Sequence, residues 1–233
     1  MSDDLLVTNT SNSSTNSKTP RPVLEGIFAF PPNRNTLGGT AYLILEKVGN
    51  ILVDSPAWTE ANQEFIQAQG GVSYLFISHR NGMAQIKAIQ ETTQCQVIIQ
   101  EQEAYLLPEV QLTTFEQDYR LTPNCKAMWT PGYSPGSSCL YCQTNGGVLF
   151  TGRNLLPNRQ GKATPLRIAK TFHWYRQLRS LNQLRDHFDS STLQYILPGA
   201  NTGFLRGRGF IDNATEHLSG LDFAALRQQP VGL

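Results

Sequence analysis

The sequence of 233 residues contains only four histidines and four cysteines, and it lacks any long, uninterrupted apolar run. Because a membrane-spanning helix needs about 20 mainly apolar residues in a row, we expect no membrane span. The N-terminus also lacks the order of basic, apolar and small residues that marks a secretory signal. These absences predict a protein of the cytoplasm. So few histidines also make a histidine-rich site for two metals hard to build.

Acidic residues are absent from residues 119–185, a segment that holds ten arginines and lysines. Residues 1–118 have the opposite balance, with thirteen acidic and six basic residues, so the formal net charge of the chain is only +1. A long segment of one sign indicates either a solvated basic face or a surface that meets an anionic partner. The segment therefore bears on partners and says nothing about the fold.

The first twenty residues are rich in Ser, Thr and Asn, and they have almost no apolar side chain after Val7. Such a segment buries too little surface to offset the conformational entropy that it would lose on ordering. We therefore expect a disordered tail over residues 1–20 and a single domain over residues 21–233.

The rest of the chain alternates between strand and helix patterns. Short apolar runs bounded by Gly, Asn or Pro predict strands, and they lie at 23–30, 40–45, 51–53, 74–77, 97–99, 127–130, 138–143, 148–151 and 194–197. Apolar residues at helical spacing predict helices, over 58–69, 83–90, 101–107, 170–188 and 212–226, with Asp212 as the cap of the last. This alternation indicates an α/β fold built in layers.

Five short segments follow one another in a recognisable order. They read Leu-Val-Asp-Ser-Pro at 52–56, Ile-Ser-His-Arg-Asn-Gly-Met-Ala at 77–84, Thr-Pro-Gly-Tyr-Ser-Pro-Gly-Ser at 130–137, Val-Leu-Phe-Thr-Gly-Arg at 148–153 and Ile-Leu-Pro-Gly-Ala-Asn at 196–201. From Val23 to the C-terminal helix, the chain thus resembles the metallo-β-lactamase-fold superfamily of hydrolases. The resemblance implies a four-layer αββα sandwich of the α/β (α+β) class, with its site at the edge where loops from both sheets converge.

The second motif of that superfamily is altered in this sequence. In the superfamily it reads Thr-His-x-His-x-Asp-His, because imidazoles and a carboxylate on one short loop hold two metal ions. Here His79 keeps the first ligand position, but Asn81, Met83 and Ala84 occupy the next three. Arg80 replaces the first spacer residue.

The other metal-binding positions have changed as well. Tyr133 stands at the histidine of the third motif, Arg153 at the bridging aspartate and Ala200 at the final histidine. Asp54 of the first motif remains, although the resemblance gives it mainly a supporting role. An open catalytic zinc site needs about three protein ligands of His, Cys or carboxylate type, and an arginine repels a cation at short range. We therefore predict that the di-zinc site is lost and that the protein uses no metal and no cofactor.

Two histidines are the best candidates for a different metal. His79 and His173 supply imidazoles, and Asp54 or Asp212 supplies oxygen ligands. The simpler interpretation is that His79 hydrogen-bonds to loop backbone and that His173 packs at the start of a helix.

Cysteine and serine chemistry is also weakly indicated. Cys139 and Cys142 have a C-x-x-C spacing, but in a strand two such residues face opposite sides. We expect buried, free cysteines, which fit a reducing compartment. The serines at 134, 137 and 138 lack a recognisable histidine partner for nucleophilic catalysis.

The altered edge is basic and polar, and we expect it to bind an anionic small molecule or an acidic protein partner, because arginine forks suit carboxylates and phosphates. The candidate ligand-binding residues are Asp54, His79, Arg80, Asn81, Tyr133, Arg153, His173, Asn201 and Arg206. The alternative is that Arg153 pairs with a carboxylate such as Asp54 and only fills the old metal site.

Three functions stay open on the sequence. The first is a non-catalytic pseudo-hydrolase that binds an anion or an acidic protein. The second is an atypical hydrolase of esters or phosphodiesters with a mononuclear or metal-independent site. The third is a nucleic-acid-binding relative, which the basic segment and Arg206-Gly-Arg208 favour but the lack of a recognisable motif opposes. The segments 100–107 and 171–174 also resemble a cyanobacterial and chloroplast branch of the superfamily.

Overall fold

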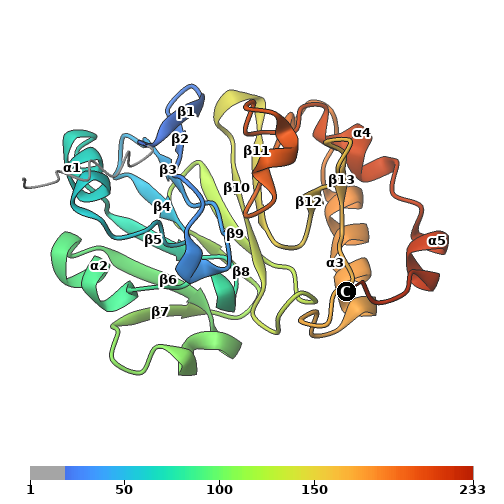
Figure 1. Ribbon diagram of the computed structural model, residues 1–233, viewed down its shortest axis with the longest axis horizontal. Helices are drawn as coiled ribbons and strands as arrows, with labels where there is room; N and C mark the ends of the chain where they lie inside the picture. Colours follow the sequence, from blue (N-terminus) through green and yellow to red (C-terminus); the bar gives the residue numbers. More distant parts are fainter. Residues whose placement is uncertain (1–18, 233) are drawn as a thin grey trace, which may run out of the picture.

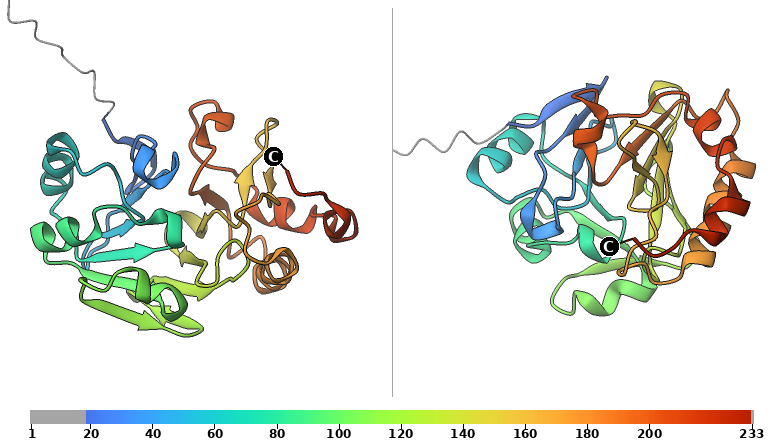
Figure 2. Two further views of the ribbon diagram at one scale, coloured as in Figure 1. Left: turned by 60° about the horizontal axis from the view of Figure 1, so that its bottom comes forward. Right: turned by 45° about the vertical axis from the view of Figure 1, so that its right-hand side comes forward.

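Two β-sheets lie face to face, with helices on both outer sides (Figure 1; Figure 2 gives two further views). The computed structural model describes residues 19–232, so the tail predicted for residues 1–20 lies, up to residue 18, outside the described residues. Within the described part of the chain, no helix is both long and apolar enough to cross a membrane. The four layers confirm the αββα sandwich that the sequence motifs predict.

The first sheet has seven strands in chain order. They are β1 (Arg21–Leu24), β2 (Ile27–Ala29), β3 (Tyr42–Ile44), β4 (Ile51–Val53), β5 (Tyr74–Ile77), β6 (Gln96–Gln100) and β7 (Leu112–Phe115). Strands β1 to β4 pair antiparallel, whereas β4 to β7 pair parallel. Two helices cover its outer face, α1 (Glu60–Ala68) and α2 (Ile86–Thr93).

The second sheet has five strands in the order β14-β11-β10-β9-β8. They are β8 (Asp118–Arg120), β9 (Cys125–Trp129), β10 (Ser138–Cys142), β11 (Val148–Gly152) and β14 (Tyr195–Pro198), and only β11 and β14 pair parallel. A separate pair of short strands follows β11, made of β12 (Leu156–Pro157) and β13 (Ala163–Thr164). Helices α3 (Trp174–His187), α4 (Ala214–Ser219) and α5 (Phe223–Gln228) lie on the outer side (Figure 1).

Strand β4 shows why the short apolar runs form these layers. Its side chains alternate, so that Ile51 and Val53 enter the core between the sheets, while Leu52 enters the core beneath α1 and α2. Strand β5 follows the same rule, with Phe76 inside and Leu75 outside. A strand covered on both faces reads as a continuous apolar run, and such runs can bury every side chain only in a layered fold.

The structure corrects several predicted boundaries. The run at 23–30 is a hairpin of two strands, because the turn at Glu25–Gly26 interrupts it. The helix predicted over 83–90 forms three residues later, as α2. Strands β7 and β8 have no counterpart among the predicted strands. The helix predicted over 170–188 begins only at Trp174, after His173 as its N-cap.

The prediction of one closing helix over 212–226 is also wrong, because this segment forms two helices, α4 and α5. Helix α4 ends at Ser219 with Gly220 as its C-cap, and the side chain of Asp222 then caps α5 by accepting hydrogen bonds from two backbone N–H groups. Asn213, and not Asp212, precedes α4. The side chain of Asp222 caps the new N-terminus, which explains why a second helix begins there.

The prediction of buried, free cysteines at the C-x-x-C pair is correct for Cys139 and wrong for Cys142. Cys142 forms a disulfide with Cys125, which lies directly opposite on the neighbouring strand, with the Cα atoms 4.2 Å apart. Cys139 faces the outer core and Cys142 the inner core, so the two do face opposite sides of β10, as the spacing predicts. The reducing compartment stays a prediction. Because two of the four cysteines form a disulfide, free thiols no longer support it.

The loop between β9 and β10 packs directly against α3. The backbone of Gly132 has φ near +150°, and a Cβ atom there would lie 2.2 Å from the Cα of Gln177. No side chain fits at this position, so the close contact between the loop and α3 requires glycine.

We predict that Gly132→Ala lowers the free energy of unfolding by about 3 kcal/mol or more, because overlap with backbone adds to an unfavourable backbone conformation. The matched control is Gly38→Ala. Gly38 also has positive φ, +73°, but no atom lies within 4 Å of an added Cβ, so only about 1 kcal/mol should be lost. Urea unfolding curves measure both values. Equal losses in the two variants would contradict the packing argument.

Candidate functional site

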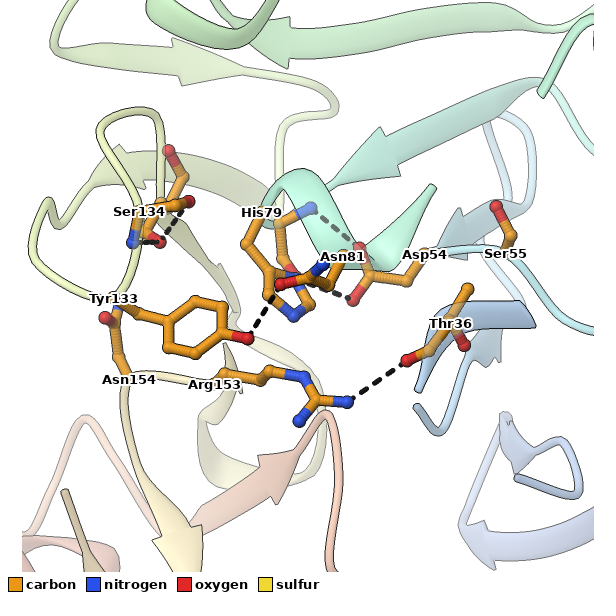
Figure 3. Close-up of polar contacts among 12 residues, drawn as sticks. Thr36, Asp54, Ser55, His79, Asn81, Tyr133, Ser134, Arg153 and Asn154 are labelled. Atoms are coloured by element: carbon orange, nitrogen blue, oxygen red, sulfur yellow. Dashed lines mark hydrogen bonds and ion pairs between the residues drawn. The ribbon is translucent and has the colours of Figure 1, made fainter. Parts of the chain in front are cut away.

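The candidate site lies where polar residues follow the ends of strands from both sheets. Asp54 comes directly after β4, and His79 follows β5 after one residue. Arg153 comes directly after β11, and Tyr133 lies in the loop between β9 and β10. Figure 3 shows that these side chains, with Asn81, point toward one another. The parallel pairing of β4 with β5 brings Asp54 and His79 to one edge of the first sheet, and Tyr133 and Arg153 reach the same edge from the second sheet.

A chain of hydrogen bonds runs through Asp54, Ser78 and His79, all of them buried. Ser78 donates twice to the Asp54 carboxylate, from its backbone N–H to Oδ1 at 2.8 Å and from its hydroxyl to Oδ2 at 2.6 Å. The same hydroxyl oxygen lies 2.9 Å from His79 Nδ1. Since the hydroxyl hydrogen goes to the carboxylate, the oxygen accepts from Nδ1–H. The lone pair of His79 is therefore on Nε2.

Burial shifts the pKa of both Asp54 and His79. It raises the pKa of Asp54 to about 6, although the hydrogen bonds from Ser78 and the charge of Arg153 act in the opposite direction. Burial also lowers the pKa of His79 to about 3, and the charge of Arg153 lowers it further. His79 Nδ1 lies 3.8 Å from Asp54 Oδ2, but a neutral imidazole makes no ion pair. At neutral pH the site thus holds a carboxylate and an uncharged histidine.

Tyr133 closes the site over the imidazole of His79. The two ring centroids are 5.2 Å apart, and only 3% of Tyr133 is exposed. The Tyr133 hydroxyl donates to Asn81 Oδ1 at 2.8 Å (Figure 3). His79 Nε2 is buried and has no hydrogen-bond partner among the described residues. The ring of Tyr133 thus separates the lone pair of the motif histidine from solvent.

Arg153 joins the two sheets at this edge. Its Nη2 donates to the carbonyl of Thr36 at 3.1 Å (Figure 3). The same nitrogen donates to the carbonyl of Leu37 at 2.8 Å, and both carbonyls lie in the loop between β2 and β3. Its guanidinium carbon lies 5.9 Å from the centroid of the Tyr133 ring. The alternative pairing with Asp54 is not found within residues 19–232. Arg153 Nε is buried and without a partner in the same part of the chain.

Arg80 is held by an acidic residue. Its Nε lies 3.2 Å from Oε1 of Glu103, whose side chain is fully buried, while Arg80 is about one-third exposed. A Cβ on Gly136 would lie 2.8 Å from the Glu103 side chain. The loop between β9 and β10 therefore packs closely against Glu103. The charge of Arg80 is therefore largely neutralised.

Three predicted site residues lie outside this cluster. His173 is exposed, and its Nδ1 accepts from the backbone N–H of Arg176 at 3.2 Å, so it caps α3, in line with the simpler interpretation. Asn201 and Arg206 flank a short 3₁₀ helix, η5 (Thr202–Leu205), and both are exposed. No hydrogen bond or ion pair in the described region joins them to the other six. Their membership of one binding site stays a prediction.

Sequence reasoning missed Ser78, Glu103 and the carbonyls of Thr36 and Leu37. Ser78 had a signal, since it precedes His79 in the motif, but Glu103 had none. Two glycines make room for the cluster. A Cβ on Gly82 would lie 2.3 Å from Asp54 Oδ1, and one on Gly152 would lie 2.6 Å from the Ser78 hydroxyl oxygen.

The side chains at this edge do not fit a di-metal centre. Across residues 19–232, no three or more His, Cys, Asp or Glu side chains converge on one point. His79 Nε2 is the one ligand atom of the motif that points into the site, and the positive charge of Arg153 lies beside it. A site that binds zinc needs more donors and no adjoining cation.

Two stacked sheets, flanking helices and a polar site at the edge where strands from both sheets end define the metallo-β-lactamase fold. The sequence matches no protein-family model and no curated protein. In structure, the chain is similar to a metallo-β-lactamase family protein from Thermus thermophilus, with a TM-score of 0.61 and 18% identity, over 89% of this chain and 81% of that chain. Likeness at this identity establishes the fold alone.

Two further solved structures are similar. One is a metallo-β-lactamase from Cronobacter sakazakii described by a HARLDQ motif, with a TM-score of 0.58 and 16% identity, over 91% of this chain and all of that chain. The other is an N-acyl homoserine lactone hydrolase with its product at a catalytic metal centre, with a TM-score of 0.51 and 18% identity, over 69% of this chain and 80% of that chain. The photosynthetic branch stays a prediction.

We predict that the His79→Gln variant loses less folding stability at acidic pH than the wild type does. In the wild type, the unfolded chain binds a proton at His79 near pH 6.5, whereas the folded protein does so only near pH 3. The wild type should therefore lose stability relative to the variant as the pH falls from 6.5 to 4. The raised pKa of Asp54 acts in the opposite direction between about pH 4 and 6, but it is present in both proteins.

Denaturant unfolding at several pH values measures the difference between the two proteins. His187→Gln, at an exposed position, controls for the loss of a histidine as such. Parallel stability profiles for wild type and His79→Gln would show that His79 is not buried in its neutral form.

Proposed function

We propose that this protein is a non-catalytic pseudo-hydrolase, and that the edge described above binds an anionic small molecule or an acidic segment of a protein partner. The observation that carries the proposal is the environment of Arg153, a cation at the position where the superfamily has its bridging carboxylate. It has no carboxylate partner within the described residues, and its Nε is buried and unpaired.

The hydrogen bonds of the cluster leave Arg153 available to an anion. Asp54 is already satisfied by Ser78, so it does not compete for the guanidinium. Arg153 uses Nη2 for the loop carbonyls, and among the described residues no hydrogen bond involves its Nη1. A guanidinium with free N–H groups favours carboxylate or phosphate ligands.

The HARLDQ motif of the Cronobacter protein offers a comparison. Set against the pattern His-x-His-x-Asp-His, its printed letters keep the first histidine and the aspartate but have Arg and Gln at the other two ligand positions. The present chain goes further, because Met83 replaces the aspartate as well. This supports a loss of the metal centre without deciding what replaced it.

Hydrolysis by another route is less favoured by the geometry. Ser78 is 1% exposed, and its hydroxyl hydrogen is given to Asp54, so it is not placed to attack a substrate. His79 Nε2 has the lone pair that a general base needs, but Tyr133 covers it. Hydrolysis that depends on His79 is therefore the result that would contradict the proposal.

We predict well under one equivalent of zinc, iron and manganese per chain in protein purified without chelator, measured by plasma mass spectrometry. Hydrolysis of p-nitrophenyl acetate and of bis(p-nitrophenyl) phosphate should equal that of the His79→Gln variant. A stoichiometric metal, or activity that the variant loses, would overturn the pseudo-hydrolase proposal in favour of an atypical hydrolase.

Anion binding is expected to depend on Arg153. Calorimetric titration with citrate and with a short poly-aspartate peptide should show at least a tenfold weaker affinity for Arg153→Gln than for wild type, since a charged hydrogen bond contributes about 1.5–3 kcal/mol. Arg153→Lys keeps the positive charge but lacks the planar guanidinium, so it tests whether the paired N–H donors are needed. Arg159→Gln, exposed in the same basic segment, is the matched control. Equal affinities for the Gln variants at 153 and 159 would exclude this edge.

A further inference from the structure

A cavity of about 270 Å³ lies beside the candidate site, between the N-terminal strands and the loop that carries η5. Arg21 and Phe30 line it from one side, and Thr202 and Gly203 line it from the other. A hydrogen bond from Arg21 to the carbonyl of Gly207 joins the two walls. Figure 2 shows in its right-hand view how this loop passes beside β1 and β2. None of the six clustered residues of the candidate site lines this cavity.

The charge around the cavity is positive. Arg21 has no carboxylate within 4.0 Å in residues 19–232, and the same holds for Arg206 on the adjoining loop. Arg208 is different, because it pairs with Asp212 at 3.1 Å. The guanidinium of Arg21 donates one hydrogen bond to a backbone carbonyl, and an arginine has five N–H donors. Arg21 therefore retains donors for an anion.

Two threonines add a further donor to the wall. The hydroxyl oxygens of Thr40 and Thr202 are 3.1 Å apart, and Thr40 is only 3% exposed. Each hydroxyl carries one hydrogen, and their mutual bond uses only one of the two. The second hydrogen is directed elsewhere, and both threonines line the cavity. A ligand with an acceptor group would satisfy it.

Four neighbouring residues give the cavity an apolar wall. Ala29, Phe30, Pro31 and Pro32 line the cavity, and none of these side chains can hydrogen-bond to a ligand. A void of about 150 Å³ accommodates a molecule the size of benzene, so the volume suffices for a ring that carries a small polar group. Small-molecule sites typically combine such an apolar lining with a few polar groups that fix orientation.

We propose that this cavity binds a small carboxylate with a compact apolar body, of the size of benzoate or hexanoate. The carboxylate group pairs with Arg21 and accepts from the threonine pair, while the body contacts Phe30 and the two prolines. An inorganic phosphate, which has no apolar body, fits the lining less well. The site is separate from the Arg153 edge, so it stands whether or not the proposed function is correct.

Gly203 provides a direct test of the cavity. Its backbone lies outside the left-handed region, and no atom lies within 4 Å of an added Cβ. A larger side chain is therefore tolerated there by the fold. We expect Gly203→Leu to fold with an unchanged melting temperature and to fill part of the cavity, whereas Gly203→Ala leaves most of the space free.

The experiment is a titration of the full chain with benzoate, hexanoate and phosphate, followed by calorimetry and by amide NMR shifts. Benzoate should bind to wild type and Gly203→Ala, and at least tenfold more weakly to Gly203→Leu and Arg21→Gln. Phosphate should bind more weakly than benzoate. Arg34→Gln, at an exposed position outside the lining, should behave as wild type. Arg153→Gln is titrated in parallel to separate the cavity from the neighbouring edge.

Two outcomes would overturn the proposal. One is the absence of benzoate and hexanoate binding to folded wild type. The other is binding that Gly203→Leu and Arg21→Gln leave unchanged, which would place the ligand elsewhere. If benzoate binding is instead lost in Arg153→Gln alone, the carboxylate site is at the neighbouring edge, and the cavity proposal fails while the proposed function is supported.

Discussion

The buried carboxylate of Asp54 is the constraint on which the candidate site depends. A charge with 5% exposure needs hydrogen bonds to offset the loss of water, and Ser78 supplies two of them. Once the Ser78 hydroxyl points at the carboxylate, its oxygen can only accept from His79, which determines the tautomer of the imidazole. The close approach of Gly82 to the carboxylate, where even a methyl group would overlap, follows from the same demand.

Arg153 gives this edge a positive charge, where the sequence motifs of the superfamily predict a bridging carboxylate. A bridging carboxylate attracts cations and holds them between two sheets. A guanidinium at the same position holds the sheets together itself, through the carbonyls of Thr36 and Leu37. It also stabilises the neutral form of His79. Within the described residues, Arg153 thus joins the two sheets and places a positive charge beside His79, where it disfavours a second cation.

The sequence motifs were sufficient to predict the fold and that Asp54 and Arg153 lie at one edge of it, and insufficient to predict the contacts that these residues make. Asp54 and Arg153 each follow a strand directly, so the order of motifs predicts that they meet at one edge. The partners of Arg153 are backbone carbonyls, which every residue has, and no sequence pattern marks which ones are used. The disulfide of Cys125 and Cys142 depends on the register of β9 and β10, and the length of the connecting loop does not specify that register.

The attachment of Tyr133 has a consequence for how the site moves. Its backbone carbonyl accepts from the N–H of Phe172, and that of Gly132 accepts from the N–H of His173, at 3.0 and 2.9 Å. The loop is thus fixed to the residues that begin α3, and a hinged opening would have to break both bonds. Rotation of the Tyr133 side chain would leave both backbone bonds intact and break only the hydrogen bond from its hydroxyl to Asn81 Oδ1. A rotation of the Tyr133 side chain is therefore the change that would expose His79 with the fewest broken bonds, and it would leave both sheets in place.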